Sequence, residues 1–251
     1  MNENVTMRIL QATQPYELYM KVIGISPQRR NFLRKAAVAV PVAAAIGAIG
    51  TAGTVLATGD GQDKPYQPTY FTAAEWATLC ALVDRLIPAD AEGPGALQAG
   101  VHEFIDLQMD TPYAYGKLWF MQAPFVDAPD EFGYQFHMAP RELYRSALPG
   151  FAQAVQRKTG KAYSDLPVAQ RDALIAELEK GSLPIGEVPA SVFFKQLLQN
   201  TREGYFCDPA HGGNKDMAAW RMINFPGARA DYMDWVEQYG VHYPLPPASI
   251  A

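Results

Sequence analysis

The amino-acid sequence predicts an all-α fold, an irregular helical domain with long aromatic-rich loops. Several stretches carry apolar residues at the three- and four-residue spacing of an amphipathic helix, and capping residues or prolines stand at their ends. No alternating run long enough for a β-strand is present. The chain has 251 residues, of which 49% are hydrophobic and 19% charged, so a chain that is disordered throughout is excluded.

The first helix is expected over residues 72–86. Thr72 and Glu75 form a capping box, which marks the start of a helix, and Pro88 ends the element. Its apolar face consists of Trp76, Leu79, Cys80, Val83 and Leu86. Cys80 is therefore predicted to be a core thiol.

Further helices are expected along the rest of the chain. A second carries Leu97, Val101, Phe104 and Ile105, and a third, behind Pro140 and kinked at Pro149, carries Leu143, Tyr144, Ala147, Leu148, Phe151 and Val155. A fourth covers residues 167–180 with Pro167 in first position, Gly181 after its end and apolar Val168, Leu174, Ile175 and Leu178. Pro189 opens a fifth with Val192, Phe193, Leu197 and Leu198, and two shorter helices are expected over 216–223 and 230–239.

Residues 1–57 have the features of an export address. Arg29 and Arg30 stand directly before Asn31, Phe32 and Leu33, an arrangement that resembles the twin-arginine export signal. Residues 36–57 carry no charge, are rich in Ala and Gly, and end in small residues suited to cleavage after Ala57. A transmembrane helix is the alternative. Residues 58–70 then form a linker, and 71–251 a single helical domain.

Composition excludes several classes of protein. The formal net charge is −5, and the Lys and Arg residues are scattered, so a nucleic-acid partner is not expected. Residues 1–57 hold six basic and two acidic residues, and their removal changes the net charge to −9. Only Cys80 and Cys207 are present, which excludes a disulfide scaffold, a zinc ribbon and haem attachment. The two thiols either form one disulfide or stay separately buried.

No motif for catalysis or for a cofactor is recognisable. There is no GxGxxG between a strand and a helix and no GxSxG elbow, which argues against a dinucleotide site and an esterase. His102 and Asp106 are one helical turn apart and could share a metal, but an exposed polar pair is the plainer interpretation. Asp208 and His211 could bind a metal or act as acid and base, or simply shape a loop. We therefore expect no catalytic, cofactor or metal site on this chain.

Residues 112–137, the aromatic segment, differ from the helical stretches. They contain eight aromatic residues without a clean period: Tyr113, Tyr115, Trp119, Phe120, Phe125, Phe132, Tyr134 and Phe136. The segment is either an irregular wall of the protein's own core or a surface that binds a partner, because aromatic residues anchor interfaces.

A segment near the C-terminus resembles a known family. The string Glu203-Gly204-Tyr205-Phe206-Cys207-Asp208-Pro209-Ala210-His211-Gly212-Gly213-Asn214-Lys215-Asp216, followed by Trp220 and Phe225-Pro226-Gly227-Ala228, resembles the gluconate 2-dehydrogenase subunit 3 family. The resemblance extends back to Phe71 and covers roughly residues 71–240. Cys207 is a departure, since a small residue such as Ser would be unsurprising there.

The resemblance implies the small, or gamma, subunit of a membrane-associated, periplasmic dehydrogenase. A large FAD-containing dehydrogenase subunit would oxidise gluconate or another sugar, and a multihaem cytochrome c subunit would pass electrons to ubiquinone and provide the membrane association. FAD and haem c would lie on these partners, and the twin-arginine address would export the folded flavoprotein with this chain. Alternatives are a stand-alone exported maturation or binding protein that releases its client, and a metal-dependent hydrolase that uses Asp208 and His211.

Two local questions follow from this picture. Gly212 and Gly213 permit close backbone approach, and Asn214 or Asp216 can cap the helix that carries Trp220. The motif, in which we expect Gly204 and Tyr205 to belong to a loop, either shapes only its own fold or also presents Tyr205, His211 and Trp220 to the flavoprotein. In the aromatic segment, the expected interface residues are Tyr113, Tyr115, Trp119, Phe120 and Phe125.

Overall fold

The computed structural model describes residues 66–126 and 128–250, which contain helices and no β-strand. The all-α class is therefore confirmed for this part of the chain, which belongs to one unit, Asp63–Ala251. The expected twin-arginine residues Arg29, Arg30, Phe32 and Leu33 lie outside the described residues, as does the rest of the expected signal. Among the described helices, none is both long enough and apolar enough to cross a membrane.

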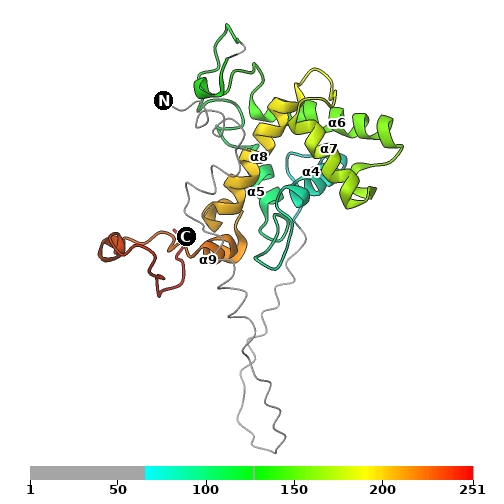
Figure 1. The fold of residues 1–251 in the computed structure, drawn as a ribbon. Helices are drawn as coiled ribbons and strands as arrows, with labels where there is room; N and C mark the ends of the chain where they lie inside the picture. The colour runs from blue at the N-terminus through cyan, green and yellow to red at the C-terminus, as the bar shows by residue number, and fades with distance from the viewer. Residues whose placement is uncertain (1–65, 127, 251) are drawn as a thin grey trace, which may run out of the picture. The chain divides into compact units, whose positions relative to one another are not determined.

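Helix α8 lies at the centre of the unit. The α-helices are α4 (Ala73–Leu86), α5 (Val101–Gln108), α6 (Pro140–Thr159), α7 (Val168–Glu179), α8 (Ala190–Phe206) and α9 (Ala218–Ile223). Short 3₁₀ turns cover Asp130–Phe132, Tyr163–Asp165, Pro209–His211, Lys215–Met217 and Tyr232–Trp235. α8 packs against α5, α6 and α7, and α4 contacts all four of these helices (Figure 1).

The predicted start of α4 is confirmed. Thr72 Oγ1 accepts the backbone N–H of Glu75 at 3.4 Å, and the Glu75 carboxylate accepts the backbone N–H of Thr72 at 2.8 Å. Leu79 and Val83 of the predicted apolar face are buried. The other three residues of that face, Trp76, Cys80 and Leu86, are half-buried.

Helix α6 contributes a large part of the core. Its six predicted apolar residues, Leu143, Tyr144, Ala147, Leu148, Phe151 and Val155, are all buried. The helix is continuous from Pro140 to Thr159 and passes through Pro149. The next residue must be glycine, because a Cβ on Gly150 would lie 1.9 Å from the carbonyl oxygen of Ile185.

Three expectations about the helices need correction. Pro167 is the N-cap of α7, with ψ of 149°, and Val168, the first residue of the helix, is 48% exposed and does not belong to its buried face. α8 continues to Phe206, so Gly204 and Tyr205 are helical and not part of a loop. Residues 230–239 contain only the 3₁₀ turn Tyr232–Trp235, since the apolar residues there do not pack against the body.

Candidate functional site

The segment between α8 and Gly227 folds around one buried side chain, that of Asn214. Its Nδ2 donates to the carbonyl of Cys207 at 2.9 Å, and its Oδ1 accepts the backbone N–H of Ala219 at 2.9 Å. The Asn214 backbone is left-handed, with φ of 45°, a conformation that asparagine tolerates better than most residues. Asn214, and not Asp216, therefore satisfies a free N–H at the start of α9.

Glycines in the same segment allow the backbone to approach α8 closely. A Cβ on Gly213 would lie 2.1 Å from the carbonyl oxygen of Gly204, and one on Gly204 would lie 2.7 Å from the ring of Phe104. Gly212 has a φ of 92°, in the left-handed region. The Gly-Gly pair and Gly204 are thus required by the packing of this segment against α8 and α5.

Asp208 holds the C-terminal end of the chain. Its Oδ1 accepts hydrogen bonds from Ser249 Oγ at 2.6 Å and the Ala210 N–H at 3.0 Å, and its Oδ2 accepts the Ile250 N–H at 2.9 Å. Burial by itself would raise the pKa of Asp208, but these hydrogen bonds outweigh it and lower the pKa. Both carboxylate oxygens therefore serve the fold.

The remaining motif residues are also used within the chain. Tyr205 is buried and donates from its hydroxyl to the carbonyl of Pro94 at 2.6 Å, and Trp220 is buried and donates from Nε1 to the carbonyl of Phe206 at 2.8 Å. His211 is exposed. Of the three side chains that the motif could present to a partner, only His211 is open to solvent. This favours a structural role for the motif.

Two prolines of the motif mark changes of chain direction. Pro209 begins the 3₁₀ turn Pro209–His211. Behind Pro226, Gly227 has a φ of 73°, and the Ala228 N–H donates to the carbonyl of Ala248 at 2.8 Å. The exposed Asp216 also adopts a left-handed backbone, with φ of 58°.

Asp106 is a fully buried carboxylate, and its role as an anchor for residues 66–71 was not predicted from the sequence. It accepts five hydrogen bonds, from the Tyr66 hydroxyl, the Thr69 N–H and hydroxyl, and the backbone N–H groups of Tyr70 and Phe71. The distances from donor to acceptor are 2.7–3.2 Å. The expectation of an exposed polar pair with His102 is therefore wrong for Asp106, which anchors residues 66–71 to α5.

His102 lies one turn earlier on α5 and is mostly buried. Its ring packs against Trp76 with centroids 5.0 Å apart, and its Nδ1 has no hydrogen-bond partner in the described part of the chain. Burial lowers the pKa of His102, opposed by the charge of Glu103. Within the described residues, no group of three or more His, Cys, Asp or Glu residues could hold a metal ion.

Tyr70 is enclosed by two guanidinium groups from α6. Those of Arg141 and Arg145 each lie 4.2 Å from the centre of its ring. Arg145 pairs with Glu75 and Arg141 with Asp110. A hollow of about 450 Å³ opens beside these residues, but both cations at its wall already have carboxylate partners.

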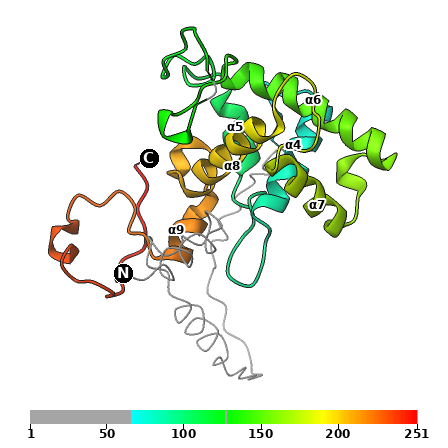
Figure 2. The same cartoon turned by 45° about the horizontal axis from the view of Figure 1, so that its top comes forward.

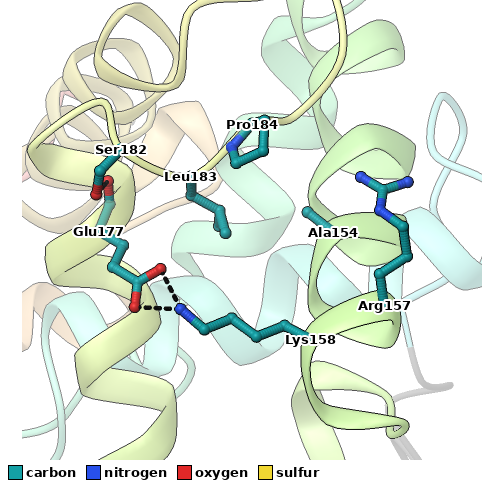
Figure 3. Close-up of a pocket in the computed structure, with 7 residues that line it drawn as sticks. All are labelled: Ala154, Arg157, Lys158, Glu177, Ser182, Leu183 and Pro184. Atoms are coloured by element: carbon teal, nitrogen blue, oxygen red, sulfur yellow. Dashed lines mark hydrogen bonds and ion pairs between the residues drawn. The ribbon is translucent and has the colours of Figure 1, made fainter.

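A second hollow, of about 280 Å³, lies between α6, α7 and the turn that contains Leu183 (Figure 3). Lys158 extends from α6 towards Glu177 on α7, and its Nζ lies 2.5 and 2.6 Å from the two carboxylate oxygens. Arg157 points away from this pair. The ion pair thus connects two helices across the hollow.

A polar network fixes the base of the aromatic segment on α8. The hydroxyl of Tyr113 accepts hydrogen bonds from Gln196 Nε2 at 2.6 Å and from Asn200 Nδ2 at 2.7 Å. Asn200 Oδ1 in turn accepts a hydrogen bond from the hydroxyl of Tyr144 at 3.0 Å. Burial raises the pKa of Tyr113 to about 12. Buried amides with satisfied hydrogen bonds give this base a defined geometry.

Within the segment, the aromatic and aliphatic side chains differ in their exposure to solvent. Trp119 packs edge-on against Tyr113 and is tilted against Tyr134, at centroid distances of 5.4 and 4.7 Å. Phe125 is half-buried, 6.4 Å from the ring of His137. A second group faces solvent and is called the apolar face below: Tyr115 (52% exposed), Leu118 (70%), Phe120 (83%), Val126 (55%) and Phe132 (71%). Of the five expected interface residues, Tyr115 and Phe120 belong to this face.

The two cysteines are free thiols in the structure and are half-buried. Burial raises the pKa of Cys80 to about 11 and also raises the pKa of Cys207. Cys207 follows the last residue of α8, and its Sγ donates to the carbonyl of Gly204 at 3.4 Å. Neither thiol lies in an environment that favours the reactive thiolate.

Comparison with known proteins gives one result. A sequence model of the family described as gluconate 2-dehydrogenase subunit 3 matches residues 73–227. No curated protein matches the chain, and no solved structure matches it either. The matched range contains α4 to α9, Asp106, the aromatic segment and the motif from Gly204 to Gly227.

Proposed function

Because the chain belongs to the gluconate 2-dehydrogenase subunit 3 family, we propose that it is the non-catalytic small subunit of an FAD-dependent gluconate or sugar dehydrogenase complex in the periplasm. In this proposal, a large subunit carries FAD and oxidises the substrate. A multihaem cytochrome c subunit passes the electrons to ubiquinone and provides the membrane association. The small subunit supports export, assembly and stability of the flavoprotein.

The observation that carries the proposal is the apolar face of the aromatic segment. Its five side chains come from one segment and are each at least half exposed, and exposed apolar side chains concentrated in this way are typical of partner-binding surfaces. Near the start of the same segment, the hydroxyl of Tyr113 accepts hydrogen bonds from Gln196 and Asn200 of α8, which fix that end of the segment on the body. Exposed aromatic groups suit the binding of a protein partner.

The family motif supports the same role in a different way. Asn214, Gly213 and Trp220 make contacts inside the chain, so the motif stabilises the junction between α8 and α9. We therefore assign to the motif the stability of the subunit's own fold, and to the apolar face the binding of its partner.

Copurification tests the proposal. The tagged chain, produced in its native host and extracted in mild detergent, should retain a flavoprotein with dye-linked gluconate or sugar dehydrogenase activity. Phe120→Ser combined with Leu118→Ser should weaken this association about 30-fold, equivalent to about 2 kcal/mol, because hot-spot residues commonly contribute this much. Val168→Ser, which removes an exposed apolar side chain from α7, is the matched control.

The results separate the candidate functions. Recovery of the chain alone from the periplasm would contradict a stable complex and favour the maturation protein that releases its client. A complex that is equally stable in the Phe120 and Leu118 variant would remove the apolar face from the interface. Far-UV circular dichroism of each variant confirms that the body remains helical.

Export is tested through the arginine pair. We propose that Arg29 and Arg30 direct the folded complex through the twin-arginine route, because an export signal on one subunit can also export a bound partner that has no signal of its own. Changing both to Lys should leave the dehydrogenase activity in the cytoplasm. Unchanged periplasmic activity would contradict this part of the proposal.

A further inference from the structure

Residues 229–247, called the C-terminal arm, form a long loop whose two ends meet. The arm lies beyond the range that the family model matches. The arm leaves the body after Ala228 and returns at Ala248, whose N–H donates to the carbonyl of Pro226 at 3.1 Å. A Cβ on Gly227 would lie 2.2 Å from the Ala248 carbonyl oxygen, so the two ends are in tight contact. Figures 1 and 2 show the arm projecting from α9, in orange and red.

The arm has an internal core and a fixed base. Tyr243 is buried, with the rings of Tyr232 and Trp235 at 5.3 and 5.2 Å and the guanidinium of Arg229 at 5.8 Å. Beyond the arm, Asp208 binds Ser249 and Ile250. These contacts hold the arm at both ends.

The outer surface of the arm combines apolar and acidic side chains. Met233 and Tyr239 are 79% and 84% exposed, and Val236 and Val241 of the same arm are about half exposed. Asp231, Asp234 and Glu237 are also exposed. With Arg229 as the only basic residue besides His242, the arm has a net charge of −2. Its surface is thus complementary to an apolar groove with a basic rim.

We propose that the C-terminal arm is a second docking element, which inserts Met233 and Tyr239 into an apolar groove of the catalytic subunit that is bordered by Lys or Arg. The acidic charge favours a basic protein surface over anionic lipid, which would repel it. The inference rests on the proposed function, because the catalytic subunit is the partner. The arm and the apolar face would each bind the catalytic subunit. Loss of either one therefore weakens the complex without abolishing it.

Charge reversal tests the electrostatic part. The combined variant Asp231→Lys, Asp234→Lys and Glu237→Lys is compared with Asp165→Lys, Glu179→Lys and Glu187→Lys, which changes the net charge equally at exposed positions outside the arm. The probe is the catalytic subunit, identified by its FAD spectrum and sugar-dependent dye reduction, and the measurement is its Kd for the full small subunit at low and high salt. We expect about 10-fold weaker binding for the arm variant at low salt and a smaller difference at high salt.

A second variant tests the apolar part. Met233→Ser with Tyr239→Ser should weaken binding about 30-fold at both salt concentrations, because both side chains are exposed and their loss leaves the fold intact. Equal Kd values for wild type and both arm variants would overturn the arm proposal while leaving the proposed function standing. Failure of the wild type to bind the catalytic subunit would contradict the proposed function itself. Arm-dependent binding to phosphatidylglycerol vesicles, or arm-dependent dimerisation of this chain, would also overturn the assignment.

Discussion

The hydroxyl of Tyr66 donates a 2.7 Å hydrogen bond to the buried carboxylate of Asp106, forty residues further along the chain. The ring of Tyr66 also stacks on Trp76 of α4, with centroids 5.6 Å apart. The first described residue is thereby held by both α4 and α5. Tyr66 is therefore fixed on the body, although the sequence predicts a linker over residues 58–70.

Asp106→Asn should strongly destabilise the body. The neutral amide loses the charge that strengthens five hydrogen bonds, and its NH₂ group would face N–H donors that need an acceptor. We expect the free energy of unfolding to fall by about 3 kcal/mol. Urea denaturation followed by circular dichroism measures this change.

Asp110→Asn is the matched control for that prediction. Asp110 also lies near Thr69 and pairs with Arg141, but its side chain is 55% exposed. Exposed ion pairs contribute only about 0–1 kcal/mol. A similar loss of stability in both variants would show that burial of Asp106 is not the cause.

Local signals in the sequence predicted the helices that pack through a single face. α4 was predicted from its capping box and α6 from six apolar residues at helical spacing, because both signals lie within one helix. The sequence also narrows the cap of α9 to Asn214 or Asp216, and the structure shows Asn214, whose partner Ala219 is only five residues away. Such short-range relationships depend on the local backbone alone.

Relationships across the fold could not be predicted in the same way. The donors to Asp106 lie 35–40 residues away, and the partners of Tyr113 lie 83 and 87 residues away, so no local pattern identifies them. Residues 230–239 illustrate the opposite error. Met233 and Val236 have helical spacing, but no surface of the body covers them, and a single 3₁₀ turn forms instead.

Asn214→Ala should destabilise the junction between α8 and α9. The variant leaves the carbonyl of Cys207 and the N–H of Ala219 without their side-chain partners in a buried position. It also places alanine in a left-handed backbone, which costs about 1 kcal/mol. We expect a total loss of about 3 kcal/mol in the free energy of unfolding, measured by urea denaturation.

Asn224→Ala separates the two contributions. Asn224 also has a left-handed backbone, with φ of 57°, but it is exposed. This control should therefore show the backbone cost of about 1 kcal/mol alone. Equal effects at both positions would mean that the side-chain hydrogen bonds of Asn214 contribute nothing measurable.

Both thiols should remain free and react slowly in the folded protein. With a pKa of about 11, Cys80 at pH 8 contains about 100-fold less thiolate than a thiol with a pKa of 9. The variant Cys207→Ser, which retains only Cys80, should react with a disulfide reagent correspondingly slowly, and rapidly once unfolded in guanidinium. Mass spectrometry of the unreduced protein should find two free thiols, and a mass two hydrogens lower would reveal the disulfide instead.

The stability of the body should fall in mild acid because of His102. Burial lowers the pKa of His102 in the folded state below its ordinary value of 6.5, against the opposing charge of Glu103. The unfolded chain therefore takes up this proton first as the pH falls below about 6.5, so the stabilising contribution of the neutral ring is lost as the pH falls through the folded pKa.

His102→Phe keeps a ring against Trp76 and removes the titration. The free energy of unfolding, measured between pH 7.5 and 5 by urea denaturation, should decline more steeply for the wild type than for His102→Phe, with the exposed His242→Phe as the control for loss of one imidazole. Parallel curves for the wild type and His102→Phe would contradict the assignment of this pH dependence to His102.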